Sequence, residues 1–396
     1  MTAIPLGFED TVAPLRAAHE RILQHLQARG LWVSDTPRPT VPGNAEGIAA
    51  ARAYPIQGIL KYHGLADWHW RTAFMPSISV NNSAAYTLTW VSFEPARAED
   101  EVVIGGEVAI GRERARVVRT LDAVREVAGI ASKARVISYN VVRATRAGKG
   151  LGTSASASAA LAAAALAAAL GADILGNTRL LSTTARLLAG SGCRSAVGGV
   201  SLWLSYPGIP HEESVAVRLD AASELDDLRL ITVPLPSRIG LKTEQAHLDA
   251  PRSPFFKPWI LGRGEEIIDC AEAIWRGDWQ QLSRWAELDS IRLHGVTMSG
   301  GMEHKLFAWE PENIELFRLC NELRSGGVPV YFSTDTGPTT VFLTHRDYEQ
   351  ALVGALEGMG RGWEVIRGRV AGPVELVEAE QAQEELKRAF DALTPF

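Results

Sequence analysis

Hydrophobic residues recur at helical spacing in several long segments of this 396-residue chain. The clearest case covers residues 12–31, where Leu15, Ile22 and Leu26 fall on one face and predict an amphipathic helix. An alanine-rich run that ends near Leu170 predicts a second helix, because alanine has the highest intrinsic helix propensity. Similar patterns predict further helices at 112–130, 182–188, 260–285, 314–324, 348–359 and 378–393.

Other segments alternate between apolar and polar residues, as half-buried strands do. Short alternating runs fill residues 58–93, and further strands are predicted at 102–110, 134–142, 200–204, 228–233, 328–332 and 340–343. A proline-rich connector at 35–43 separates the first helix from this main body. Helices and strands do not alternate regularly, so the order favours an α+β fold over a doubly wound sheet.

Composition narrows the class of protein. The net charge of −6 argues against general nucleic-acid binding. Cys193, Cys270 and Cys320 are odd in number and lack CxxC spacing, so neither a disulfide framework nor a zinc site is expected. No signal peptide is visible, and the most apolar stretch, 157–170, is too short and alanine-rich to span a bilayer. We therefore expect a cytoplasmic protein with no membrane partner.

A glycine-rich segment precedes the alanine-rich helix and carries the first chemical signal. It reads Lys-Gly-Leu-Gly-Thr-Ser over 149–154, with Thr153 or Ser154 expected to cap the helix. A helix N-terminus behind flexible glycines offers free N–H donors and a partial positive charge, which suit a phosphate group. The spacing is neither that of a P-loop nor of a dinucleotide fingerprint. Taken alone, the segment is equally compatible with an ordinary turn that caps a buried helix.

Three other segments follow the order of one family together with this loop. They are Lys-Tyr-His-Gly at 61–64, Ser-Gly-Cys-Arg-Ser at 191–195 with Gly198-Gly199, and Asp-Thr-Gly-Pro at 335–338. Over about residues 55–345 the chain resembles the GHMP kinase superfamily, within it the mevalonate diphosphate decarboxylase branch, and most of all the phosphomevalonate decarboxylases.

The resemblance implies an α+β fold with two lobes. It implies an ATP-binding domain over 46–225 with a fold like ribosomal protein S5 domain 2, and a ferredoxin-like domain over 226–396. Residues 1–45, a helical extension with the proline-rich connector, precede the first family motif and depart from the family pattern. It also implies a homodimer. The active site is expected in the cleft between the lobes.

The family reaction implied is an ATP-dependent decarboxylation in isoprenoid biosynthesis. The C3 hydroxyl of a phosphorylated mevalonate is phosphorylated, and loss of that phosphate with the C1 carboxylate then leaves an alkene. By resemblance, Asp335 faces the hydroxyl as base or orienting group, Lys61 lies near it, and Arg194 grips the carboxylate. Such roles suit the residue types, since a carboxylate accepts a proton and an arginine fork binds a carboxylate through two bonds.

Two sets of phosphate ligands follow from the same resemblance. For ATP, with Mg²⁺, they are Gly150, Gly152, Thr153, Ser154 and Ser156; metal ligands remain unknown. For the substrate phosphate they are Tyr62, Ser237 and Arg238. Taken singly, Asp335 is also compatible with a turn carboxylate and Arg194 with an ordinary ion-pair arginine, whereas a lysine in an apolar strand is rarely buried without a partner.

One departure from the family bears on the substrate. The family's early motif has a second lysine that touches the diphosphate, and Leu65 stands there in this chain. Loss of a charge-assisted hydrogen bond of about 1.5–3 kcal/mol favours mevalonate 5-phosphate, converted to isopentenyl phosphate. The alternative is that Lys149, Lys242 or Arg71 replaces the lysine and the diphosphate remains the substrate.

Three further alternatives stay open. A decarboxylase of a bisphosphorylated mevalonate needs no ATP, which the glycine loop argues against. A kinase that stops after phosphorylation does not need Arg194. A binding protein that kept only the fold does not need the three reactive side chains.

Overall fold

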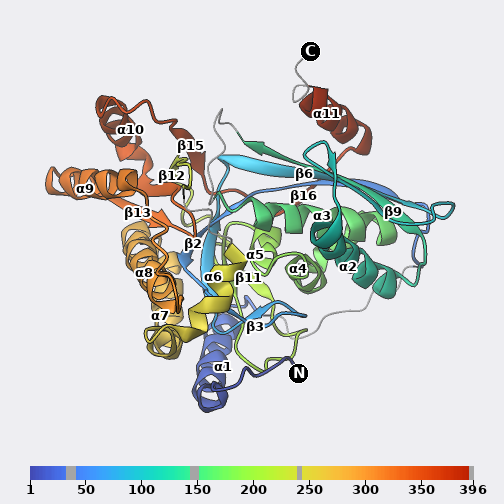
Figure 1. Cartoon of the computed structure of the whole chain (residues 1–396), viewed down its shortest axis with the longest axis horizontal. Coiled ribbons are helices and arrows are strands. Elements are labelled where there is room, and N and C mark those ends of the chain that lie inside the picture. The colour runs from blue at the N-terminus through green and yellow to red at the C-terminus, as the bar shows by residue number, and fades with distance from the viewer. Residues whose placement is uncertain (33–41, 143–150, 239–242, 392–396) are drawn as a thin grey trace.

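An alanine-rich helix, α3 (Thr153–Leu170), lies at the centre of the first lobe. The computed structural model describes residues 1–32, 42–142, 151–238 and 243–391 (Figure 1). By length and composition α3 is able to cross a bilayer, but 83% of it is buried in the interior of the fold. The chain before β1 passes very close to this helix: a Cβ on Gly47 would lie 1.7 Å from the carbonyl oxygen of Ala168 in α3. The alanine-rich segment is therefore a buried core helix of the first lobe.

A six-stranded sheet covers α3. Its strands, from one edge to the other, are β16 (Glu375–Val377), β1 (Ile48–Ala53), β6 (Ala85–Glu94), β9 (Lys133–Val142), β7 (Glu101–Ile104) and β8 (Glu107–Val108). All neighbours are antiparallel except the β7–β9 pair. The edge strand β16 comes from the far end of the chain (Figure 1).

Helices cover both faces of this sheet (Figure 1). On the face of α3 lie α2 (Gly111–Ala128), α4 (Thr178–Arg186) and α5 (Gly192–Val197). On the other face, α11 (Ala379–Asp391) packs Ala382 and Leu386 against Leu88 and Trp90 of β6. Residues 375–391 therefore return to the first lobe, although the sequence interpretation assigned 226–396 to one C-terminal domain.

A second sheet lies between the lobes. It has four strands in the order β11 (Ala216–Arg218), β10 (Val200–Trp203), β5 (Ser77–Asn81) and β2 (Ile56–Leu60). A small hairpin, β3 (Leu65–Asp67) with β4 (Thr72–Ala73), follows β2. Gln57 of β2 donates to the Ser333 hydroxyl at 2.8 Å, which links this sheet to the second lobe.

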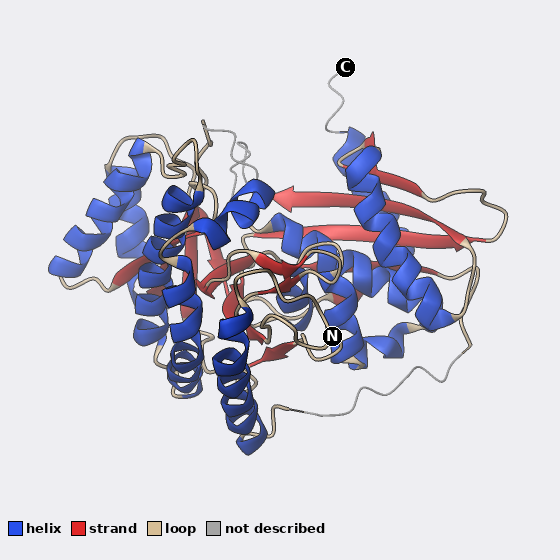
Figure 2. Ribbon diagram, turned by 60° about the horizontal axis from the view of Figure 1, so that its bottom comes forward, coloured by secondary structure: helices blue, strands red, loops and turns tan. Residues whose placement is uncertain are grey.

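The second lobe has the βαββαβ order of a ferredoxin-like domain. Its antiparallel sheet runs β13 (Val330–Thr334), β14 (Thr340–His345), β12 (Leu228–Val233) and β15 (Ile366–Arg369). Its helices are α6 (Thr243–Asp249), α7 (Phe256–Trp275), α8 (Trp279–Gly300), α9 (Pro311–Ser325) and α10 (Glu349–Gly358) (Figure 1). Figure 2 shows that both lobes combine helices (blue) with strands (red). The expected α+β fold with a ferredoxin-like part is confirmed.

The predicted N-terminal helix is present as α1 (Val12–Ala28). It packs against α7, where a Cβ on Gly264 would lie 2.5 Å from the Ala18 side chain. The N-terminal residues also reach the first lobe, since the Thr2 N–H donates to the Ile209 carbonyl at 3.2 Å.

Two sequence predictions of elements were wrong in detail. The helix expected at 260–285 is two helices, because Gly277 takes a left-handed conformation (φ 67°) and Asp278 caps α8 through the Gln281 N–H. The strand β1 was missed, since its sequence Ile-Ala-Ala-Ala-Arg-Ala has the composition of a helix. Its pairing with β6 and β16 determines its conformation instead.

Candidate active site

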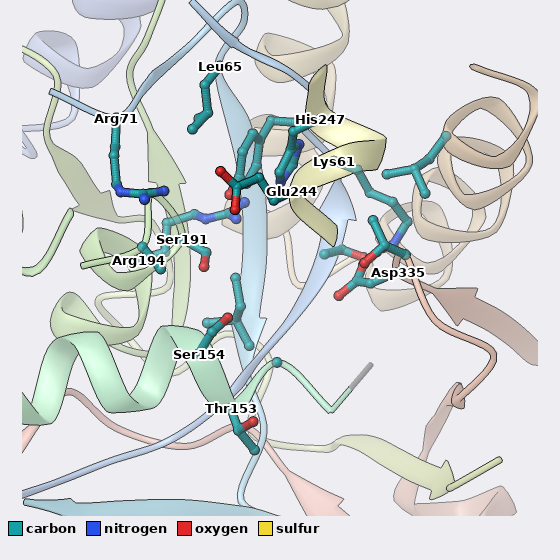
Figure 3. A pocket seen from close by; sticks show the side chains of 18 of the residues that line it. Lys61, Leu65, Arg71, Thr153, Ser154, Ser191, Arg194, Glu244, His247 and Asp335 are labelled. Atoms are coloured by element: carbon teal, nitrogen blue, oxygen red, sulfur yellow. Dashed lines mark hydrogen bonds and ion pairs between the residues drawn. The ribbon is translucent and has the colours of Figure 1, made fainter. Parts of the chain in front are cut away.

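A cavity of about 500 Å³ lies where the two lobes meet (Figure 3). Segments far apart in the sequence line it: the end of β2 and the hairpin after it, the start of α3, the turn before α5, α6, and the loop after β13. Lys61, Arg194 and Asp335 all line this one cavity. The structure therefore brings together the three side chains that the sequence singled out for the reaction.

Lys61 and Asp335 form the central pair of the cavity. The Lys61 ammonium is 2% exposed and donates to Asp335 Oδ1 at 2.8 Å, to the Ser333 hydroxyl at 2.9 Å and to the Gly58 carbonyl at 2.8 Å. The Asp335 side chain is 28% exposed, so one face of its carboxylate stays open to the cavity. Glycine at 58 leaves room, since a Cβ there would lie 3.0 Å from Asp335 Oδ1.

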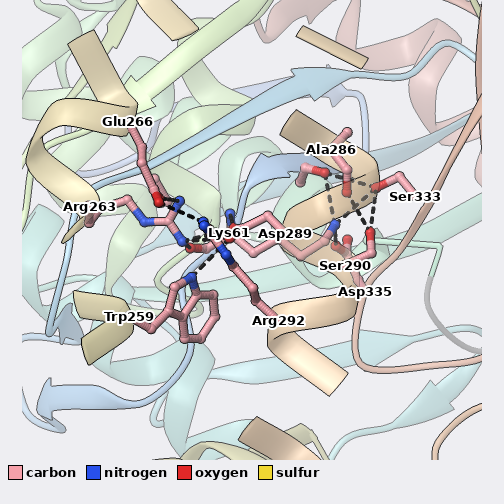
Figure 4. Close-up of polar contacts among 12 residues, drawn as sticks. Lys61, Trp259, Arg263, Glu266, Ala286, Asp289, Ser290, Arg292, Ser333 and Asp335 are labelled. Atoms are coloured by element: carbon pink, nitrogen blue, oxygen red, sulfur yellow. Dashed lines mark hydrogen bonds and ion pairs between the residues drawn. The ribbon is translucent and has the colours of Figure 1, made fainter. Parts of the chain in front are cut away.

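A buried ionic network fixes the backbone of Lys61 (Figure 4). Asp289 Oδ2 accepts the Lys61 N–H at 2.6 Å and binds the Arg263 guanidinium at 2.8 Å. Arg263 donates to the Lys61 carbonyl at 3.1 Å, and the Trp259 indole donates to Asp289 at 2.9 Å. The side chains of Arg263 and Asp289 are both fully buried and compensate each other's charge, and Glu266 adds a second carboxylate to Arg263 at 3.0 Å.

His294 supports Asp335 from the opposite side. Its Nε2 donates to the Asp335 carbonyl at 2.9 Å and lies 3.1 Å from the Thr334 hydroxyl. Burial, together with the positive charge of Lys61, lowers the pKa of His294 to about 3. The neutral ring therefore holds the Asp335 backbone without adding charge to the cavity.

Arg194 approaches the cavity from α5. Its guanidinium donates to the Ser77 hydroxyl at 2.9 Å and lies 5.3 Å from the centre of the Tyr62 ring, while its Nε is buried without a hydrogen-bond partner. Burial lowers the pKa of Arg194 and raises that of Tyr62. A buried guanidinium with donors left over is suited to an anionic ligand.

The start of α3 forms another wall, with Gly152, Thr153 and Ser154 lining the cavity. The predicted cap is wrong: the N-cap residue is Gly152 (φ 70°), without a side-chain cap. Only glycine fits there, because a Cβ would lie 2.4 Å from the Ile56 carbonyl oxygen. The first N–H groups of the helix and its partial positive charge thus face the cavity.

Three predicted phosphate ligands, Ser156, Ser237 and Arg238, do not line the cavity. Ser156 is buried, with its hydroxyl bonded to Thr87 at 2.6 Å and to the Thr153 carbonyl at 3.0 Å. Arg238 is exposed and pairs with Glu312 at 2.7 Å; neither it nor Ser237 lines the cavity. Gly150 lies outside the described residues. Ser156 lies on the face of α3 that packs against β6, so its hydroxyl contacts Thr87 of that strand and not the cavity.

Several cavity residues were missed or given no role from the sequence. The cavity is also lined by Arg116 of α2, Glu244 and His247 of α6, and Trp68 of the hairpin. Arg71 lines it too, although the sequence suggested it only as a substitute for the missing lysine at position 65. His247 Nδ1 accepts the Gly64 N–H at 3.0 Å, and its ring stacks on Tyr62. Burial is the main cause that lowers the pKa of His247 to about 4. No motif marks these positions, since only the fold brings them together.

A smaller cavity of about 180 Å³ lies between the sheet and the first turns of α3. It is lined mainly by apolar side chains, among them Val102, Ile104, Val136 and Leu161, with Ser138 and Asn140 at hand for hydrogen bonds. Such a lining suits a flat, partly polar ring.

Two lobes with a cavity between them, and the N-terminus of a helix placed near a lysine–aspartate pair, are the features of a GHMP kinase-type fold. The comparisons with known proteins agree. The family model of the diphosphomevalonate decarboxylase-like N-terminal domain matches residues 53–216. The phosphomevalonate decarboxylase of Haloferax volcanii is 35% identical over 84% of this chain and 99% of its own length. The chain belongs to the diphosphomevalonate decarboxylase-like family.

Other relatives show the breadth of this family. The mevalonate 3,5-bisphosphate decarboxylase of Thermoplasma acidophilum is 27% identical over 83% of this chain and 78% of its own length. Two solved structures cover 84% of this chain: mevalonate diphosphate decarboxylase from Staphylococcus aureus (29% identity, TM-score 0.76, 98% of its length) and from Enterococcus faecalis (28%, 0.73, 100%). The latter was studied for ATP binding.

Proposed function

We propose that this enzyme decarboxylates mevalonate 5-phosphate with ATP to give isopentenyl phosphate, ADP, phosphate and CO₂. The observation that carries the proposal is the Lys61–Asp335 pair, held at 2.8 Å in the same cavity as Arg194 and the start of α3. The family relationship supports a decarboxylase. The substrate and the need for ATP are inferred from the residues of the cavity.

Each of the three side chains has a distinct task. The open face of Asp335 accepts the proton of the C3 hydroxyl as that oxygen attacks the γ-phosphate of ATP. Lys61 holds the carboxylate in place and stabilises negative charge that develops near it. Arg194 binds the C1 carboxylate through its guanidinium and orients it for loss as CO₂ when the C3–O bond breaks.

The residues present fit ATP. The start of α3 supplies N–H donors for phosphate oxygens, and the absence of a Cβ at Gly152 lets the chain turn against Ile56. The smaller cavity beside α3 has the lining that a purine base needs. Magnesium bound to the ATP phosphates neutralises charge on them. Among the described residues no group of three His, Cys, Asp or Glu side chains forms a metal site, so Thr153 and Ser154 are the proposed protein contacts of that ion.

Leu65 supports the monophosphate as substrate. Its side chain is 5% exposed and lines the cavity where the family pattern has a lysine. An apolar side chain in that place offers no hydrogen bond to a second phosphate group.

Purified enzyme is to be assayed for CO₂ and phosphate release with mevalonate 5-phosphate, the 5-diphosphate and the 3,5-bisphosphate, each with and without ATP. We expect the highest kcat/KM with the 5-phosphate, and only in the presence of ATP. A higher value with the diphosphate refutes the monophosphate assignment. Turnover of the bisphosphate without ATP supports instead the activity named for the Thermoplasma relative. Sedimentation of the same sample tests the proposed homodimer.

A further inference from the structure

Arg71 and Arg116 line the end of the cavity that lies away from Asp335, and neither forms an ion pair with a carboxylate in the described part of the chain. Arg116 donates to the Leu188 carbonyl and Arg119 to the Leu187 carbonyl, both on the segment before α5. The Nε of Arg71 is buried and has no hydrogen-bond partner among the described residues. Glu244 lies near both arginines, so the protein compensates the positive charge at this end only in part.

The backbone around Arg71 is held from several sides. Asp67 accepts the Trp70 N–H and the Ala3 N–H, both at 2.8 Å, and Arg186 donates to the Trp70 carbonyl at 2.8 Å. The hairpin is thus fixed by the first lobe and by the N-terminal segment together.

This framework holds Arg71 in a conformation that non-glycine residues rarely adopt, with φ at 53°. Its carbonyl oxygen lies close to Gly190, where a Cβ would be 3.2 Å away. Strain that the surroundings enforce is typical of functional positions. The side chain points into the cavity beneath Leu65 (Figure 3).

Glu244 limits the charge that this end can accept. It lines the same cavity as Arg71 and Arg116, and its carboxylate is bonded to Arg112 at the surface. A phosphate monoester carries about −1.5 to −2 charges at pH 7, which two guanidinium groups balance. A diphosphate brings further negative charge toward Glu244 and toward the apolar side chain of Leu65.

We propose that Arg71 and Arg116 bind the 5-phosphate of the substrate and that Glu244, with Leu65, excludes a second phosphate. The inference rests on the proposed function and adds its specificity-determining residues. The hydroxyl-bearing end of the substrate then lies at Asp335, its carboxylate at Arg194 and its phosphate at Arg71. His247, whose Nδ1 is occupied by the Gly64 N–H, presents its Nε2–H as a neutral donor in the same cavity.

The test compares Arg71→Gly and Arg116→Gln with wild type on the 5-phosphate and the 5-diphosphate. Arg71→Gly removes the guanidinium and suits the left-handed backbone, so we expect a stable protein. For each variant KM for the 5-phosphate should rise roughly 10- to 100-fold, as expected for a lost charged hydrogen bond, with a smaller change in kcat and an unchanged KM for ATP. Arg71→Lys should recover part of the loss.

Arg114→Gln is the matched control on α2, since Arg114 binds Glu99 and the Asp100 carbonyl away from the cavity. Glu244→Gln should raise kcat/KM for the diphosphate relative to the monophosphate by roughly 2- to 5-fold, as expected for loss of one partly exposed charge.

The outcomes separate this inference from the proposed function. A wild-type preference for the diphosphate overturns the proposed function itself. A preference for the monophosphate that survives both arginine substitutions with unchanged KM overturns only the present inference. If Arg71→Gly does not fold, Arg116→Gln gives the same decision.

Discussion

The carboxylate of Asp289 accepts the backbone N–H of Lys61 at 2.6 Å, although the two residues are 228 positions apart. Through this bond, α8 of the second lobe determines where a lysine at the end of β2 stands. The same carboxylate oxygen binds Arg263 at 2.8 Å, so the position of Lys61 depends on a fully buried ion pair.

Asp289→Asn is expected to destabilise the fold and to reduce activity. The amide still accepts the Lys61 N–H, but Arg263 loses a buried counter-charge, which costs about 3 kcal/mol. Urea unfolding measures this loss. Glu287→Gln on the same helix is the control: its partner Arg324 is 27% exposed, so we expect about 1 kcal/mol or less. Equal losses in both variants contradict the role given to the buried pair.

Asp335→Asn should abolish most turnover while leaving the fold intact. Removing a general base lowers kcat by about 10²- to 10⁴-fold. The Lys61 ammonium keeps the Ser333 hydroxyl and the Gly58 carbonyl but loses its carboxylate partner, so the melting temperature should fall while the protein stays folded. Steady-state kinetics and thermal unfolding are measured on one preparation, with Asp347→Asn at an exposed position as control. Full activity of Asp335→Asn contradicts the proposed role.

Gly152→Ala tests whether the start of α3 needs glycine to bind ATP, and Gly129→Ala, at a glycine of similar backbone conformation, is the control. Gly129 (φ 65°) ends α2 and a Cβ there meets nothing within 4 Å, so Gly129→Ala costs only about 1–2 kcal/mol of backbone strain. At Gly152 the Cβ would also meet the Ile56 carbonyl oxygen at 2.4 Å. We therefore expect a larger loss of stability and a higher KM for ATP. An ATP affinity unchanged by Gly152→Ala, measured by calorimetry, speaks against the phosphate site.

Acid should weaken the fold through its buried histidines. Burial lowers the pKa of His19 to about 4, whereas the unfolded chain titrates near 6.5. Between these values the unfolded state binds the extra proton, so stability is highest above pH 6.5 and falls toward pH 4. In this range one such histidine changes the free energy of unfolding by about 1.4 kcal/mol per pH unit.

His19→Gln removes that part of the slope, whereas His304→Gln at an exposed position does not. Urea unfolding between pH 4 and 7 measures both variants. Identical slopes in wild type and His19→Gln show that His19 does not take part.

Motifs predicted the reacting centre, and only the fold revealed the rest of the site. Lys61, Arg194 and Asp335 stand in short segments whose order is that of the family, and the structure brings them into one cavity. Arg71 and Glu244 carry no such signal, because a charged residue in a hairpin or short helix has the pattern of a surface residue. Ser237 and Arg238 matched a family motif, yet Arg238 pairs with Glu312 outside the cavity.

The element pattern was most informative where one face of a segment is buried. The helix at 12–31 and the strand at 228–233 show clear periods and were predicted well. The strands β1 and β16 gave no signal, since both obtain their conformation from distant partners. The break at Gly277 was missed because the apolar pattern continues across it.

The pairing of β1 with β16 affects how the sheet is completed during translation. During translation the outer edge of β1 must wait for a partner more than 300 residues downstream, and until then it presents unpaired backbone groups to any neighbouring chain. The six-stranded sheet of the first lobe therefore stays incomplete during translation until residues 375–377 have been made.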